Sequence, residues 1–138
     1  MTALELRKKI VEACEKHWAK NQNDCSGFVK DVADELGVAL TGQANEIIDT
    51  MQKSPWSVLK SGAQAKEKAV LGKFVLGGLK DSPHGHVVVV VDGPLAHGTY
   101  PTAYWGSLGG IGKKATTINW SWNKSDRDQV IYCCIDIN

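Results

Sequence analysis

The hydrophobic and polar positions divide this chain into a helical first half and a strand-rich second half. As far as residue 70, apolar side chains recur every three or four residues, which places them on one face of an α-helix. From residue 73 onward, runs of β-branched and aromatic residues end at Gly, Pro and Asp, as strands do at turns. Helices followed by mostly antiparallel strands predict an α+β fold. No repeat, low-complexity tract or linker interrupts the chain, so we expect a single domain over residues 1–138.

The first half predicts four helices. Thr2 and Glu5 have the spacing of a capping box, which begins the first helix. Its inward positions follow the helical period at Leu6, Ile10, Ala13, Cys14 and Trp18. The second helix begins at Cys25 and stops at Gly37. The others are predicted over Ala44 to Gln52 and from about Gly62 to Val70.

The second half predicts five strands. The clearest is His86-Val87-Val88-Val89-Val90-Val91, because a run of β-branched residues suits a sheet that is covered on both faces. The other four are predicted at Lys73 to Leu79, Ala103 to Trp105, Thr116 to Trp122 and Gln129 to Ile137. Five aromatic residues are candidates either for a groove or for packing: Trp56, Tyr104, Trp105, Trp120 and Trp122.

A cysteine stands in the first turn of the second helix. Asp24 suits the N-cap position, and apolar residues recur behind it as on a core-facing stripe: Phe28, Val29, Val32, Ala33 and Leu36. A thiol at a helix N-terminus faces the positive end of the helix dipole, which predicts a lowered pKa for Cys25. Ser26 and Gly27 are small enough for a substrate backbone to approach, and the Cys25 amide can stabilise an oxyanion. Cys25 is therefore a candidate nucleophile; the alternative is a buried cysteine that only packs.

Composition narrows the classes of partner. With 43% hydrophobic and 22% charged residues, the chain has the composition of a globular protein. Its formal net charge of +1 predicts neither nucleic acid nor an anionic membrane surface as a partner. No apolar run approaches the roughly 20 residues that span a bilayer. The segment from Met1 to Lys9 lacks the apolar stretch of a secretory signal, so we expect synthesis in the cytoplasm without a signal peptide.

The four cysteines do not have the spacing of a disulfide framework or a zinc site. Adjacent Cys133 and Cys134 on a strand point to opposite faces, so at most one of them can join Cys14. Plain packing is the favoured state for these three, and a Cys14 bridge is the second option.

A cysteine nucleophile needs a general base, and His86 is the best candidate among four histidines. It begins the stiff valine strand, which would hold a base more rigidly than a loop, and Gly85 before it leaves access open. His17 is expected to be half-buried on the first helix, His84 to line a cleft without rigid support, and His97 to be solvated in a loop. The pattern alone leaves the Cys25–His86 pair balanced against an inert cysteine and a structural histidine.

The segments Asp24-Cys25-Ser26-Gly27-Phe28-Val29 and Gly85-His86-Val87 resemble the NlpC-type papain-like amidases, and most closely the first family of type VI secretion amidase effectors. The likeness continues in order through Ala33 to Val38, Ser61 to Ala63, Gly78 to Lys80, Gly93 to Leu95, Tyr100-Pro101, Gly106-Ser107 and Asp126 to Asp128. The resemblance implies a papain-like single domain with its helices packed on the sheet. It implies hydrolysis of the bond between D-glutamate and meso-diaminopimelate in peptidoglycan of a rival's periplasm, reached through the type VI apparatus. It also implies a dedicated immunity protein that blocks the active site, and we expect the chain itself to be a monomer.

The resemblance implies Cys25 as nucleophile and His86 as general base and acid, with no metal or organic cofactor. Papain-like enzymes usually carry a third polar group that orients the base. Ser107 or a backbone carbonyl is the candidate here, and Asn119 is a more distant option. The segment Asp126-Arg127-Asp128 is expected to hold a loop by ion pairs. Two other functions stay open, a papain-like acyltransferase and a non-catalytic cell-wall-binding module of the same fold.

Overall fold

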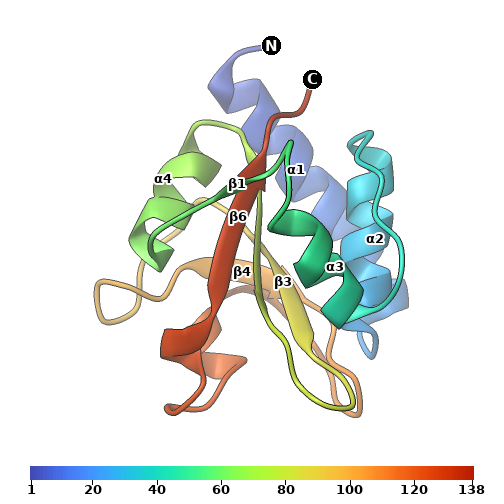
Figure 1. Cartoon of the computed structure of the whole chain (residues 1–138). Coiled ribbons are helices and arrows are strands. Elements are labelled where there is room, and N and C mark those ends of the chain that lie inside the picture. Colours follow the sequence, from blue (N-terminus) through green and yellow to red (C-terminus); the bar gives the residue numbers. More distant parts are fainter.

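The structure, a computed structural model, describes residues 1–138 and confirms the α+β class. Four α-helices lie within the first 70 residues and pack on a six-stranded sheet (Figure 1). They are α1 (Ala3–Trp18), α2 (Cys25–Glu35), α3 (Ala44–Met51) and α4 (Gly62–Val70). The strands are β1 (Ser57–Val58), β2 (Phe74–Leu79), β3 (His86–Val90), β4 (Thr102–Trp105), β5 (Lys113–Thr117) and β6 (Ile131–Ile135). Three 3₁₀ turns complete the elements: η1 (Ala19–Asn21), η2 (Ile118–Trp120) and η3 (Arg127–Gln129).

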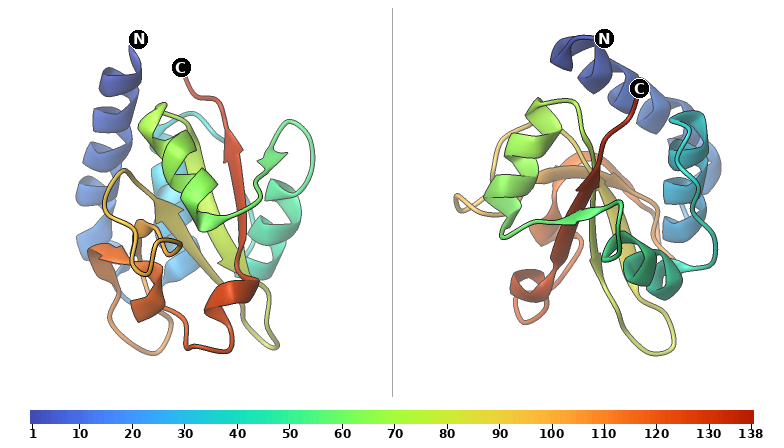
Figure 2. Two further views of the ribbon diagram at one scale, coloured as in Figure 1. Left: turned by 90° about the vertical axis from the view of Figure 1, so that its left-hand side faces the viewer. Right: turned by 45° about the horizontal axis from the view of Figure 1, so that its top comes forward.

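The sheet is antiparallel throughout, with the strand order β1-β6-β2-β3-β4-β5. Helices α1, α2 and α3 cover one face and α4 covers the other (Figures 1 and 2). The valine strand β3 serves both faces: Val87 and Val89 pack under the three helices, while Val88 and Val90 pack with α4. A helix that carries Cys25 against a strand that carries His86 is consistent with a papain-like fold.

The four predicted helices form for the predicted reasons. The capping box of Thr2 and Glu5 is present as predicted, and α4 begins after an N-cap at Ser61 that was not predicted. In α2 the predicted stripe is buried, with Phe28 and Val32 fully excluded from solvent. Burying a side chain of this kind contributes roughly 1.5–3 kcal/mol, so this stripe fixes α2 against the sheet. Gly37 ends α2 with a φ of 78°, a conformation that glycine adopts without strain. No helix of the protein has the length and apolar character of a membrane span.

The predicted strand from Thr116 to Trp122 is wrong over most of its length. The ladder between β4 and β5 ends at the pair Thr102↔Thr117, because the next residue of the partner strand is Pro101. The Pro101 carbonyl accepts from the Ile118 amide at 3.0 Å, but proline has no N–H to return a bond. The Ile118 carbonyl instead accepts from the amides of Ser121 and Trp122, so the chain turns through η2.

Two further differences concern the other edge of the sheet. The strand predicted over Gln129 to Ile137 is shorter, Ile131–Ile135, because its partner β2 offers register positions only from Phe74 to Gly78. The two-residue strand β1 was not predicted, since Ser57 and Val58 are exposed and carry no alternating pattern.

All four cysteines are free and buried, which confirms plain packing for Cys14, Cys133 and Cys134 and leaves the Cys14 bridge unformed. As predicted, the adjacent pair points to opposite faces: Cys133 packs under the helices with Cys14, and Cys134 packs on the other side.

Candidate active site

Cys25 is the first residue of α2, and Asp24 is its N-cap as predicted. The Asp24 Oδ1 atom accepts from the Gly27 amide at 2.9 Å and from the Ser26 hydroxyl at 3.1 Å. This cap fixes the turn that presents the sulfur, because it satisfies an amide that the helix itself leaves unpaired.

The small residues around the two candidate groups have a structural role that was not predicted. A Cβ atom on Gly27 would lie 2.4 Å from Asp24 Oδ2, so a glycine is needed for the cap to close. A Cβ atom on Gly85 would lie 2.3 Å from Asn45 Oδ1 and 2.8 Å from the Leu79 carbonyl oxygen. Gly85 therefore lets the turn between β2 and β3 pack against α3, in addition to any effect on access.

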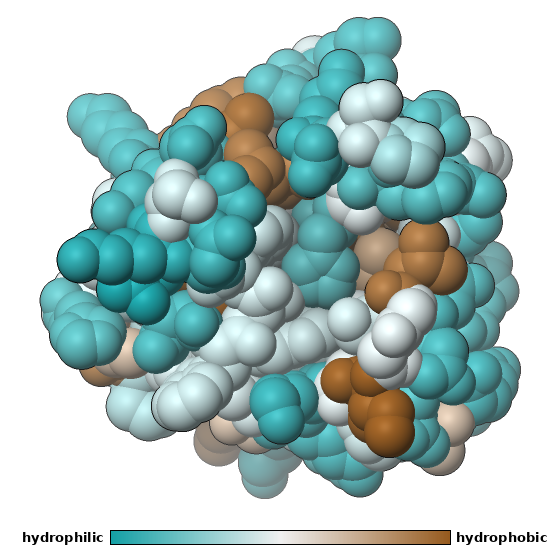
Figure 3. Space-filling view, turned by 90° about the horizontal axis from the view of Figure 1, so that it is seen from below, coloured by the Kyte–Doolittle hydropathy of each residue, from teal (hydrophilic) through white to brown (hydrophobic).

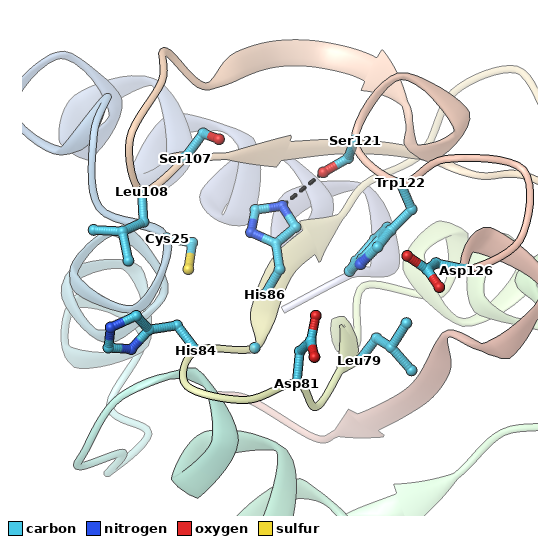
Figure 4. A pocket seen from close by; sticks show the side chains of 11 residues that line it. Cys25, Leu79, Asp81, His84, His86, Ser107, Leu108, Ser121, Trp122 and Asp126 are labelled. Carbon is cyan, nitrogen blue, oxygen red and sulfur yellow. Dashed lines mark hydrogen bonds between the residues drawn. The ribbon is translucent and has the colours of Figure 1, made fainter.

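His86 begins β3 opposite Leu79 of β2, so the sheet holds its backbone. Its ring packs edge-on against Trp122, with the ring centroids 4.9 Å apart. Cys25 and His86 line one cavity of about 270 Å³, and Figure 4 shows the thiol beside the imidazole on the side that carries Nδ1. The fold thus brings the two predicted residues together from elements 61 positions apart in the sequence.

The other ring nitrogen of His86 makes a hydrogen bond that the sequence did not reveal. Its Nε2 lies 2.6 Å from the Ser121 hydroxyl (Figure 4). Ser121 follows the η2 turn, and the sequence placed it inside a strand instead. The only signal that could have singled out Ser121 in the sequence was its position next to Trp122, the aromatic residue that packs against His86.

The predicted third group, Ser107, lies on the wall of the same cavity and makes no side-chain hydrogen bond with His86. Asn119 makes none either, and its buried Oδ1 has no hydrogen-bond partner in the protein. The ion pairs expected at Asp126 to Asp128 are absent. Arg127 instead stacks on the Tyr100 ring at 4.8 Å, and the Tyr100 hydroxyl donates to Asp128.

Burial shifts the pKa values of both Cys25 and His86, and the shift at Cys25 is opposite to the one predicted from the sequence. Burial raises the pKa of the Cys25 thiol; hydrogen bonds from backbone amides, first that of Val87, oppose this effect only in part. The lowering predicted from the helix N-terminus is therefore wrong for the resting protein. Burial also lowers the pKa of His86 to about 4. At neutral pH both groups are uncharged, so the imidazole is free to accept a proton.

The remaining histidines are placed as follows. His17 is more buried than predicted; its Nε2 lies 3.0 Å from Glu35 Oε1, and it does not line the cavity. His84 lines the cavity from an exposed turn, and His97 is exposed in its loop, both as predicted. Among the five aromatic candidates, Trp122 lines the cavity and Trp120 is exposed, while the other three are buried.

A second cavity of about 390 Å³ adjoins the first at Cys25. The two cavities share Cys25, His84, Gly85 and Leu108, so they meet at the candidate nucleophile. The space-filling view from below shows that the molecule is hollowed on this side (Figure 3). The His86 side carries the carboxylates of Asp81 and Asp126, and neither makes an ion pair. The other side carries the start of α2 with the carboxylate of its N-cap Asp24, and Lys30, which also makes no ion pair. The site is thus an open groove with the candidate nucleophile and base at its centre, two carboxylates at one end, and one lysine together with the Asp24 carboxylate at the other.

Comparison with known proteins shows that the chain is similar to a protein of assigned activity. The chain is 42% identical over 134 aligned residues to peptidoglycan amidase Tse1 of Pseudomonas aeruginosa, and the alignment covers 89% of this chain and 86% of that protein. No family model matches the chain.

Proposed function

The chain belongs to the family of the peptidoglycan amidase Tse1, and on this premise we propose that it is a cysteine amidase that hydrolyses peptidoglycan stem peptides. The bond cut is that between D-glutamate and meso-diaminopimelate. The observation that carries the chemistry is the pairing of Cys25 and His86 in one groove, on a helix start and a strand start. We take residues 1–138 as one papain-like amidase domain.

The groups in the groove suffice for acyl transfer to water. His86 Nδ1 takes the proton of the Cys25 thiol as the sulfur attacks the amide carbon, which gives a thiolate-derived tetrahedral intermediate and an imidazolium. The backbone amide of Cys25 stabilises the oxyanion, since the first amides of a helix have no partner within it. The imidazolium then donates its proton to the departing amine. Water, deprotonated by His86, hydrolyses the thioester and regenerates the thiol.

The charges of the groove support this particular bond. The leaving amine must lie near His86, because His86 protonates it, so diaminopimelate occupies the cavity with Asp81 and Asp126. These carboxylates suit the free ammonium group at the far end of diaminopimelate. D-glutamate then lies on the side of Lys30 and the N-terminus of α2. Lys30 favours the free α-carboxylate of a D-glutamate that is linked through its γ-carboxyl, while the Asp24 carboxylate on the same side is held by the Gly27 amide and the Ser26 hydroxyl.

The biological setting follows from the same family likeness. As a type VI secretion effector, the protein would be made in the cytoplasm and delivered to the periplasm of a rival cell. An immunity protein would protect the producing cell by covering the groove of the effector.

Product analysis of purified diaminopimelate-type peptidoglycan tests the bond. Mass spectrometry should find fragments that end at D-glutamate and fragments that begin at diaminopimelate. Intact stems after prolonged digestion would favour a binding module, and stems joined to an added amine would favour an acyltransferase. Cuts at other bonds would overturn the assignment of the two sides of the groove.

A charge variant sharpens the test. Lys30→Gln should raise KM for stems with a free D-glutamate α-carboxylate and leave KM unchanged for stems in which that group is amidated. Lys20→Gln is the matched control, because Lys20 pairs with Asp31 outside the groove. Equal KM changes on both substrates would remove Lys30 from substrate recognition.

A further inference from the structure

The hydroxyl of Ser121 is the only side-chain group that hydrogen-bonds to the imidazole of His86. The contact is 2.6 Å long and joins Oγ to Nε2, the nitrogen on the far side of the ring from Cys25 (Figure 4). His86 is otherwise surrounded by groups that offer its ring no polar contact, and Trp122 covers one edge.

The direction of this hydrogen bond decides what His86 can do. A neutral imidazole carries one proton, and the nitrogen that carries it cannot act as a base. If Nε2 carries the proton and donates to Ser121, the lone pair lies on Nδ1 and faces the thiol. If the serine donates instead, the proton lies on Nδ1 and the base is blocked.

The position of Ser121 is rigid. The Ser121 amide donates to the Ile118 carbonyl at 2.9 Å, and the Trp122 amide donates to the same oxygen at 3.1 Å. Ile118 is fully buried and is tied to Pro101 by its own amide at 3.0 Å. A hydroxyl held this way keeps the ring in one orientation, which a solvated loop would not do.

We propose that Ser121 is the positioning residue of the active site: it accepts a hydrogen bond from Nε2–H of His86 and so holds the imidazole in the tautomer whose Nδ1 faces Cys25. The serine itself neither loses nor gains a proton in the reaction. The inference rests on the proposed function, because it needs His86 to be the base. It replaces Ser107, which lines the cavity without contacting the imidazole.

The use of a hydroxyl, in place of an amide or a carboxylate, has a chemical consequence. A hydroxyl oxygen is a neutral acceptor, so it orients the ring but adds little to the stability of the imidazolium, whereas a carboxylate would add much. This agrees with the lowered pKa of His86, which follows from burial without a compensating charge. The other titratable groups that line this cavity are Cys25, Asp81, His84 and Asp126, and none of them makes a hydrogen bond with the imidazole.

Long-range ¹H–¹⁵N NMR of the histidine rings at neutral pH tests the tautomer directly, with His86 assigned by its loss in His86→Gln. We expect the Nε2–H form in the wild type and in Ser121→Thr, which keeps the hydroxyl. Ser121→Ala should give a mixture of tautomers and lower kcat roughly fivefold to tenfold with KM little changed, the effect of one neutral hydrogen bond. Ser107→Ala is the matched control and should leave the spectrum unchanged.

The pH profile of the amidase gives a second readout that a purely structural role would not move. Ser121→Asp should raise the acid limb of kcat/KM by about one pH unit or more, because a carboxylate stabilises the imidazolium. The inference is overturned if wild-type His86 carries its proton on Nδ1, if Ser121→Ala leaves the ring spectrum unchanged, or if Ser107→Ala alters it. The ring spectrum is independent of activity, so it tests Ser121 even if the Cys25 mechanism fails.

Discussion

Replacing His86 with glutamine should change how the stability of the protein depends on pH. The pKa of His86 is lowered by burial from an ordinary value of 6.5 to about 4, so folding disfavours the protonated ring. A group of this kind contributes stability above the pKa of the unfolded chain, and that contribution is lost as the pH falls through the range between the two pKa values.

The size of the effect follows from the two pKa values. We compare the free energy of unfolding of the wild type with that of His86→Gln. Relative to the variant, the wild type should lose almost none of this free energy at about pH 8, about 2 kcal/mol at about pH 5 and about 3 kcal/mol at about pH 4. Below that pH the difference should level off, because the ring is then protonated in both states. Asp81, His84 and Asp126 line the same cavity in both proteins, so the two proteins of the comparison differ only at residue 86.

Urea unfolding of both proteins, followed by tryptophan fluorescence at several pH values, measures this difference. The baseline effect of the substitution is removed because only the change of the difference with pH is used. A difference that stays flat between about pH 8 and pH 4 would refute the reasoning, since it would mean that His86 titrates alike in the folded and unfolded chain.

Three further predictions concern the helix start, the core and the thiols. Asp24→Ala should lower the free energy of unfolding by about 1 kcal/mol, and Gly27→Ala by a similar amount. The double variant should lower it by less than the sum of the two single effects, because both changes break the same cap. Additive effects in urea unfolding would contradict this. Phe28→Ala should lower it by about 3–5 kcal/mol, whereas Leu4→Ala, at a half-exposed position, should change it little; equal effects would mean that α2 is not held by its buried stripe. Alkylation of Cys25 by iodoacetamide should be slow at neutral pH and accelerate with rising pH, whereas fast labelling at neutral pH would mean that the resting protein holds a thiolate. After unfolding without reductant, all four thiols should react, and a count below four would mean that a disulfide is present.

Much of the fold could be predicted because local pattern and tertiary environment agree. In α2, the period of Phe28 and Val32 and the cap at Asp24 independently indicate the same helix, and the structure uses both. In β3, the unbroken valines predict a strand covered on two faces, and α1–α3 and α4 supply those covers.

The failures arise where a partner strand decides the outcome. Ile118 has the β-branched side chain of a strand, but its ladder stops because the residue opposite is Pro101. The third group of the candidate site was missed for the same reason, since Ser121 contacts His86 only because the chain turns there. The pKa of Cys25 could not be predicted from the helix start alone, because burial depends on the whole packed structure.

The proposed mechanism requires Cys25 as the nucleophile, and the release of new amino groups from purified peptidoglycan tests this requirement most directly. Wild type, Cys25→Ala and the buried-cysteine control Cys14→Ala should be compared at equal concentrations of folded protein, as judged by circular dichroism. We predict that Cys25→Ala releases no amino groups above background while Cys14→Ala remains active. Release by Cys25→Ala at a rate comparable to that of the wild type would contradict the cysteine mechanism.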